Sequence, residues 1–185
     1  GKMGRAIAEN CMLRGAHVTL VNASVSVEPP MFVDVVNVTS AADMAEVVKS
    51  KASEQDIIIM TAAVADFCPA HPADEKIKKK DSLDEPVIEL ERTEDILSYL
   101  GAHKAKGQLI CGFSMETQNM LENSKAKLAK KNADMIVANN LKVAGAGFGT
   151  DTNVVTLITA DDCTELEIMD KSCVAARIMD RLLQM

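Results

Sequence analysis

The sequence predicts an α/β fold, an open and mostly parallel sheet with helices on both faces and a closing β pair near the carboxyl terminus. Segments with helical spacing of apolar residues alternate with short runs rich in β-branched residues, as in parallel sheets joined by helical crossovers. The run DIIIMTAA at residues 56–63 is apolar almost throughout, as expected of a central strand covered on both faces. The 185 residues, 48% of them hydrophobic, suffice for one domain with a full core.

Helices are predicted where apolar residues recur every three or four positions. In the first helix, Met3, Ile7 and Cys11 share one face, which we expect to point inward. This helix ends at Gly15, and Ser40 is a favourable N-cap for the second. The predicted helices cover residues 2–15, 41–52, 94–105, 120–132 and 171–185.

Strands are predicted in the β-branched runs between these helices. Pro29 and Pro30 make the segment after the first strand a loop, and residues 141–153 are a glycine-rich loop. We find no linker and predict a single domain. The predicted strands cover residues 17–23, 33–38, 56–63, 86–92, 108–115 and 134–139, and residues 154–160 and 165–169 form the closing pair.

The composition excludes several classes of protein. The formal net charge is −7, unlike that of a protein that coats nucleic acid, although a local basic pocket could still hold a small anion. No apolar run approaches the roughly 18 residues needed to span a bilayer, and no signal peptide is visible. The five cysteines have no metal-ligand spacing, which favours reduced thiols in a cytoplasmic protein.

Ligands of open parallel sheets bind beyond the carboxyl ends of the strands, so the residues there are the candidate site. The segment AAVADF follows the central strand; its alanines allow close approach, and Asp66 could bind a ribose hydroxyl or a divalent metal, or cap a turn. Phe113 could stack on a base or pack in the core. The run DEKIKKK at residues 74–80 could hold an anion or form a solvated loop.

Other basic positions and helix starts point to an anionic ligand. Lys127 and Lys131 are four residues apart on one helix face, where they could share an anion or remain solvated. Thr93 can cap a helix whose free N–H groups suit phosphate. Together these features favour a ligand that carries phosphate, such as a nucleotide.

Five short segments occur in the order found in phosphopantothenoylcysteine synthetases: GKMGRAIA, AAVADF followed by EKIKK, GFSMET, IVANN and GFGTDTN. The chain resembles this family over nearly its whole length. In many bacteria the synthetase is the C-terminal domain of the bifunctional coenzyme A biosynthesis flavoprotein. The resemblance implies a Rossmann-like fold, and a ligase that activates 4'-phosphopantothenate with CTP and Mg2+ as an acyl-cytidylate. L-cysteine then displaces CMP to form an amide. It also implies a homodimer with part of residues 154–169 at the interface.

The resemblance also assigns roles to residues. Lys76 of EKIKK would contact the triphosphate and act as the catalytic cation, and Asp66 would also contact the metal. Asn139, Gly147 and Phe148 would face phosphopantothenate. The expected nucleotide contacts are Met60, Thr61, Ala62, Asp66, Lys76, Glu94, Asp95, Ile96, Leu97, Phe113, Lys127 and Lys131.

Two departures from the family pattern are visible. The helix start reads TEDI at residues 93–96, where the family has Asn-Pro-Asp-Ile. The family also has a strand, a catalytic asparagine and two serines ahead of GKMG. We therefore expect residues 1–185 to be one nucleotide-binding synthetase domain without its first strand.

Two alternatives remain open on the sequence. A dinucleotide-dependent oxidoreductase would use a similar sheet, but its GxGxxG motif is absent from these residues. A catalytically incomplete fragment that binds nucleotide is the other. The choice between CTP and ATP does not follow from the residues alone.

Overall fold

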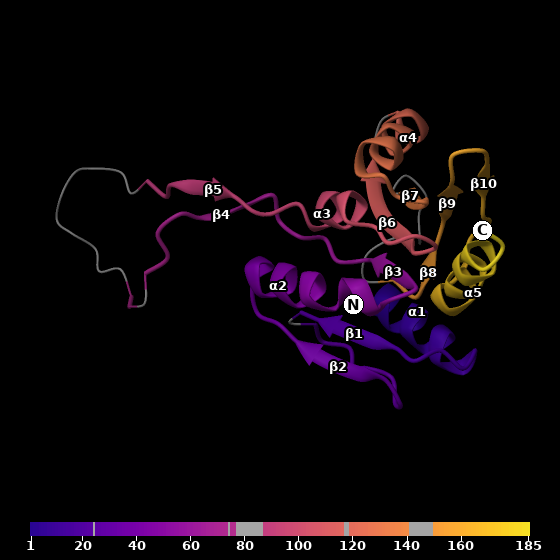
Figure 1. Cartoon of the computed structure of the whole chain (residues 1–185), viewed down its shortest axis with the longest axis horizontal. Helices are drawn as coiled ribbons and strands as arrows, with labels where there is room; N and C mark the ends of the chain where they lie inside the picture. The colour runs from indigo at the N-terminus through magenta and orange to yellow at the C-terminus, as the bar shows by residue number, and fades with distance from the viewer. Residues whose placement is uncertain (24, 74, 77–86, 117–118, 141–149) are drawn as a thin grey trace.

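The computed structural model describes residues 1–23, 25–73, 75–76, 87–116, 119–140 and 150–185. Its largest sheet has five strands in the order β10-β9-β7-β6-β3 (Figure 1). Within this sheet, β3, β6 and β7 are parallel to one another. β9 is antiparallel to β7, and β10 is antiparallel to β9. The predicted α/β class with a C-terminal β pair is therefore confirmed. The strands are β3 (Ile57–Met60), β6 (Leu109–Glu116), β7 (Met135–Asn140), β9 (Val155–Ile158) and β10 (Cys163–Glu165).

The remaining strands form three separate pairs rather than extending this sheet. β1 (Thr19–Asn22) and β2 (Asp34–Asn37) make a parallel pair beside β3 but are not bonded to it. No described strand lies between β1 and β3. The other pairs are antiparallel and join β4 (Phe67–Pro69) to β5 (Leu90–Arg92) and β8 (Thr152–Asn153) to β11 (Met169–Asp170).

Helices cover both faces of the sheet, as predicted. One buried cluster joins α1 (Lys2–Leu13) and α5 (Lys171–Leu182) to the face that carries Cys111 and Val137. The other joins the remaining helices to the face that carries Ile110. These helices are α2 (Ala41–Lys51) with the short η1 (Ala52–Glu54), α3 (Ile96–Ala102) and α4 (Met120–Lys131).

The helix ends are set by local hydrogen bonds. The hydroxyl of Ser40 accepts a bond from the Asp43 amide at 3.0 Å, and the Asp43 carboxylate accepts one from the Ser40 amide at 2.9 Å. This reciprocal cap confirms the predicted start of α2. The start of α3 differs from the prediction, because Asp95 rather than Thr93 is its cap and accepts the Ser98 amide at 2.9 Å.

Gly101 lets α3 and α4 approach each other closely. A Cβ at this position would lie 1.8 Å from the carbonyl oxygen of Lys131, so no other residue fits without moving a helix. The side chain of Asn132, which ends α4 in a left-handed conformation, donates to the Gly101 carbonyl at 2.8 Å. The ends of α3 and α4 are therefore fixed relative to each other.

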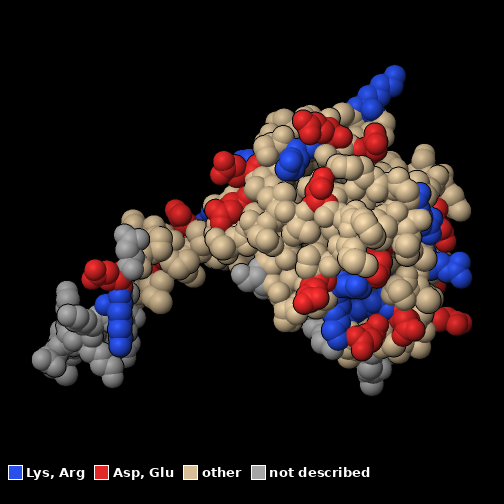
Figure 2. Space-filling view, turned by 90° about the horizontal axis from the view of Figure 1, so that it is seen from below, with Lys and Arg blue, Asp and Glu red and all other residues tan. Residues whose placement is uncertain are grey.

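The β4–β5 ladder projects from the body as an arm (Figures 1 and 2). Phe67 pairs with Arg92 at its base, and the Arg92 guanidinium lies 5.1 Å from the centre of the Phe67 ring. The predicted strand at 86–92 is confirmed only for its last three residues, and β4 was not predicted. In the described part of the chain, no helix is long and apolar enough to cross a membrane.

Candidate functional site

The carboxyl ends of β3, β6 and β7 meet at one edge of the main sheet. Met60 at the end of β3 is aligned with Gly112 on β6, and Met115 further along β6 is aligned with Asn139 on β7. Three of the segments singled out by sequence therefore lie side by side. This is the edge at which parallel sheets bind ligands.

The chain that leaves β3 presents exposed backbone at this edge. Ala62 and Asp66 are exposed, whereas Thr61 is half-buried against the first turn of α1. A Cβ at Gly4 would lie 2.9 Å from the Thr61 hydroxyl, so glycine is needed for this approach. Thr93 closes the segment from the other side, because its hydroxyl donates to the Ala65 carbonyl and its amide to that of Asp66.

Lys131 and Asp95 bind each other in the structure. The Lys131 ammonium donates to an Asp95 carboxylate oxygen and, at 2.9 Å, to the Ser98 hydroxyl. Burial alone would raise the pKa of Asp95, but the bonds from Lys131 and the Ser98 amide outweigh it and hold the pKa below its ordinary value. Lys131 therefore ties α4 to the start of α3.

Lys127 reaches the site from the same helix. Its ammonium donates to the backbone carbonyl of Phe113 at 2.9 Å. Phe113 is half-buried and packs against the core cluster beneath α1 and α5. The two lysines thus lie on one helix face, as predicted, and both have partners on neighbouring elements.

The other residues of the α3 start are held by charge and by core packing. Glu94 lies outside the helix and pairs with Lys49 of α2 at 2.7 Å, and the Lys49 ammonium also lies 5.2 Å from the centre of the Tyr99 ring. The hydrogen bond that Lys49 donates to the Glu94 carboxylate raises the pKa of Lys49 above its ordinary value. Ile96 is buried and Leu97 packs beside it in the core, so only their backbone is available to a ligand.

A second group of polar residues lies near the carboxyl end of β7. The Asn139 side-chain oxygen accepts a bond from the Asn153 side chain at 2.8 Å. Lys2 pairs with Asp151 at 2.7 Å, and the buried Lys171 donates to the Thr150 carbonyl. Burial, with Lys2 nearby, lowers the pKa of Lys171. Gly147 and Phe148, predicted to cover phosphopantothenate, lie outside the described residues.

The structure does not bring Lys76 to these residues. Phe67 and Arg92 pair at the base of the ladder, and Pro69 and Leu90 pair further from the body. Lys76 comes after β4, beyond the outer end of the ladder, and is exposed. Sequence reasoning missed Lys49, Ser98 and the bonds of Thr93. The only feature of the sequence that could have indicated a role for Lys49 is its position in the last turn of a predicted helix.

The metal-binding potential of the site rests on Asp66. No group of three or more His, Cys, Asp or Glu residues suited to a metal occurs among the described residues. Mg2+ is usually held by one or two carboxylates together with substrate phosphates. A single exposed carboxylate at a strand end fits that role.

The comparisons with known proteins decide the family. The whole chain, residues 1–185, matches the family model for the DNA/pantothenate metabolism flavoprotein C-terminal domain. The chain belongs to this family. The solved C-terminal domain of the coenzyme A biosynthesis bifunctional protein CoaBC superposes with a TM-score of 0.82 at 41% identity, over 98% of this chain and 81% of that one. The resemblance found in the sequence is confirmed.

Curated relatives are longer than this chain. It is 46% identical over 184 residues to the coenzyme A biosynthesis bifunctional protein CoaBC of Bacillus subtilis (strain 168), covering 98% of this chain and 45% of the relative. It is 44% identical over 185 residues to a cysteine/cysteine sulfinic acid decarboxylase of an unknown prokaryotic organism, covering 99% and 51%. The chain thus spans about half the length of the curated relatives it matches.

Proposed function

We propose that this chain is a phosphopantothenate–cysteine ligase domain of coenzyme A biosynthesis, acting in the cytoplasm. The proposal rests on the arrangement of residues at the sheet edge, together with the family to which the chain belongs. The carboxyl ends of β3, β6 and β7 converge there, and Lys127 and Lys131 approach from α4. The family membership favours this ligase over the oxidoreductase alternative.

The reaction has two steps. A carboxylate oxygen of 4'-phosphopantothenate attacks the α-phosphorus of CTP, the bond to the bridging oxygen breaks, and pyrophosphate leaves. The amine of L-cysteine then attacks the acyl carbon; the C–N bond forms, the bond to CMP breaks, and the amine proton passes to solvent. Activation is needed because a free carboxylate is a poor acyl donor.

The protein has to hold two anionic substrates together in the correct geometry. The exposed backbone from Ala62 to Asp66 can approach a nucleotide closely, and Lys127 and Lys131 add positive charge nearby. Bound Mg2+ would neutralise phosphate charge, with Asp66 as its protein ligand. Lys76 lies apart from these residues in one chain, so it would add a cation to the triphosphate only from the arm of a second copy.

The test is pyrophosphate release by the full-length protein. Protein, phosphopantothenate, cysteine, CTP and Mg2+ are incubated together, with ATP in place of CTP in a parallel reaction. We expect release that requires phosphopantothenate, and faster release with CTP. If no pyrophosphate appears in the complete mixture, this protein is not the ligase.

We also propose that the enzyme is a homodimer. The arm exposes large apolar side chains that one chain leaves in water, with Val87 85% and Ile88 72% exposed, and contact with a second copy would cover them. β10, in the region 154–169 expected at the interface, is likewise an exposed edge strand. Light scattering should give twice the mass of one polypeptide. Replacing Ile88 by Lys should lower the measured mass toward that of a single polypeptide.

A further inference from the structure

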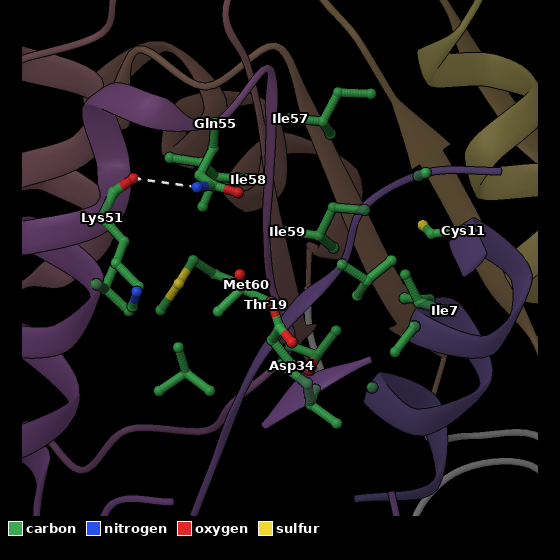
Figure 3. A pocket seen from close by; sticks show the side chains of 18 of the residues that line it. Ile7, Cys11, Thr19, Asp34, Lys51, Gln55, Ile57, Ile58, Ile59 and Met60 are labelled. Atoms are coloured by element: carbon green, nitrogen blue, oxygen red, sulfur yellow. Dashed lines mark hydrogen bonds between the residues drawn. The ribbon is translucent and has the colours of Figure 1, made fainter. Parts of the chain in front are cut away.

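The segment that leaves β3, residues 61–66, is anchored in the core on the α2 side of the sheet. Ile57 and Ile59 of β3 face α1, whereas Ile58 and Met60 face α2 (Figure 3). Val64 packs against the same buried cluster as Ile58 and Met60. The residues on either side of Val64 are exposed, so core packing fixes only the middle of the segment.

Two consecutive backbone carbonyls of this segment are held by one residue, Thr93. The Thr93 hydroxyl donates to the Ala65 carbonyl, and the Thr93 amide donates to the Asp66 carbonyl at 3.1 Å. Within the described part of the chain, no other hydrogen bond reaches the backbone of residues 62–66. Thr93 is therefore the polar anchor of the segment, 28 residues away from Ala65 along the chain.

These two bonds fix a bend in the backbone at Asp66. In an extended strand, consecutive carbonyls point to opposite sides. Both can meet the same residue only if the backbone turns between them, and the chain does bend at Asp66. Beyond the bend, the regular pairing of β4 with β5 begins with Phe67 opposite Arg92. Thr93 thus determines the direction in which the backbone carries the Asp66 carboxylate.

Thr93 is itself held through both of its neighbours in the sequence. On one side, the guanidinium of Arg92 lies 5.1 Å from the centre of the Phe67 ring at the base of the arm. On the other side, the carboxylate of Glu94 pairs with the Lys49 ammonium of α2 at 2.7 Å. A residue that is tied to the arm and to α2 in this way can hold the bend in one conformation.

We propose that Thr93 is a positioning residue of the nucleotide site: it fixes the bend at Asp66 and so sets where the Asp66 carboxylate meets the divalent cation of a bound nucleoside triphosphate. Residues that orient a metal ligand contribute strongly to affinity, because a carboxylate that is free to move binds the ion more weakly. Thr93 acts through Asp66 and does not itself contact the ion. This inference rests on the proposed function, in which Asp66 is the protein ligand of Mg2+.

Two substitutions isolate the Thr93 hydroxyl. Thr93→Val keeps the size and branching of the side chain but removes the bond to the Ala65 carbonyl, whereas Thr93→Ser keeps that bond. The backbone amide that bonds Asp66 is present in both variants and in the parent protein. Thr93 is only half-buried, so both variants should fold, with Tm lowered by no more than about 4 °C.

Binding of Mn2+ together with CTP tests the proposal without requiring turnover, since carboxylates and phosphates bind Mn2+ as they bind Mg2+. The full-length protein is titrated with the Mn2+ complex of CTP, and in parallel with that of ATP. Water-proton relaxation, which rises when the complex binds to protein, reports the affinity. Thr93→Val should bind the complex at least about tenfold more weakly than the parent protein, and Thr93→Ser about as tightly as the parent.

Two further variants complete the test. In an Asp66→Asn background, Thr93→Val should cause no further loss of affinity, because the carboxylate that it positions is gone. Thr164→Val is the matched control. Its hydroxyl also bonds a neighbour, Asp162 at 2.8 Å, but on β10, at the opposite end of the sheet from β3. This control should bind the complex like the parent protein.

Two results would overturn the inference and leave the proposed function intact. Equal affinity of Thr93→Val and the parent protein would show that the hydroxyl does not position the site. A loss that is the same with and without the Asp66 carboxylate would show that Thr93 does not act through Asp66. A parent protein that binds the Mn2+ complex of neither CTP nor ATP would instead contradict the proposed function, and the inference with it.

Discussion

Replacing Lys131 by Met should destabilise the protein by removing its bond to Asp95 and Ser98 while keeping the apolar stem. The Lys131 side chain is 13% exposed, but Asp95 is 50% exposed and can return to water. A pair that is broken while both charges stay buried costs 3–5 kcal/mol. Here we expect about 1 kcal/mol, the upper end for exposed pairs, which corresponds to a fall in Tm of about 2–4 °C.

The pH dependence gives this prediction a second, independent readout. The pKa of Asp95 is lowered in the folded protein, so its pairing stabilises the fold above the unfolded pKa of about 3.9. That contribution is lost as the pH falls through the folded value. The difference between Lys131→Met and the parent protein should therefore be present at pH 7 and smaller at pH 2.

Urea unfolding at both pH values measures the difference, and Lys130→Met is the matched control because Lys130 is exposed on the same helix. The structural role of Lys131 is refuted if its replacement leaves the free energy of unfolding unchanged within about 0.3 kcal/mol, the error of such comparisons. A tenfold loss of CTP affinity in that stable variant would instead make Lys131 a nucleotide ligand.

Three further changes test other parts of the structure. Lys76→Gln should lower ligase turnover at least about a hundredfold and leave Tm unchanged, because Lys76 is exposed; normal turnover would remove it from the mechanism. Ser114→Ala should cost about 1–3 kcal/mol by leaving the buried Ser124 hydroxyl without its partner at 2.8 Å. Adding Ser124→Ala should recover most of that loss in urea unfolding, and a purely additive double variant would contradict the pairing. Gly101→Ala should destabilise by about 3 kcal/mol or more, because the new methyl group meets the Lys131 carbonyl; an unchanged unfolding midpoint would show that the helices move apart freely.

The helices and central strands could be predicted because their signals are local. The cap formed by Ser40 and Asp43 and the left-handed Gly15 mark helix ends within a few residues. The apolar runs of β3 and β7 identify strands without knowledge of their neighbours. By contrast, β8 and β11 are two residues long and exist only because they pair across 16 residues of chain, so no local pattern announces them.

The sequence predicts where the candidate site lies in the fold, but not which side chains contact each other there. The rule on strand ends singled out Phe113, and the resemblance to the synthetases added Met60 and Asn139; these three residues lie at one edge of the sheet. The bond between Lys131 and Asp95 joins residues 36 apart, and that between Lys49 and Glu94 joins residues 45 apart. Such pairs depend on how helices pack. The direction of the arm that carries Lys76 likewise depends on tertiary structure.

The open edge of β3 has a consequence for how this protein is synthesised and handled. Four large apolar residues in a row, Ile57 to Met60, lie beside a strand edge that no other described strand covers. Such a segment can pair with copies of itself and aggregate. Refolding at low protein concentration should therefore raise the yield of soluble protein, independently of any effect on catalysis.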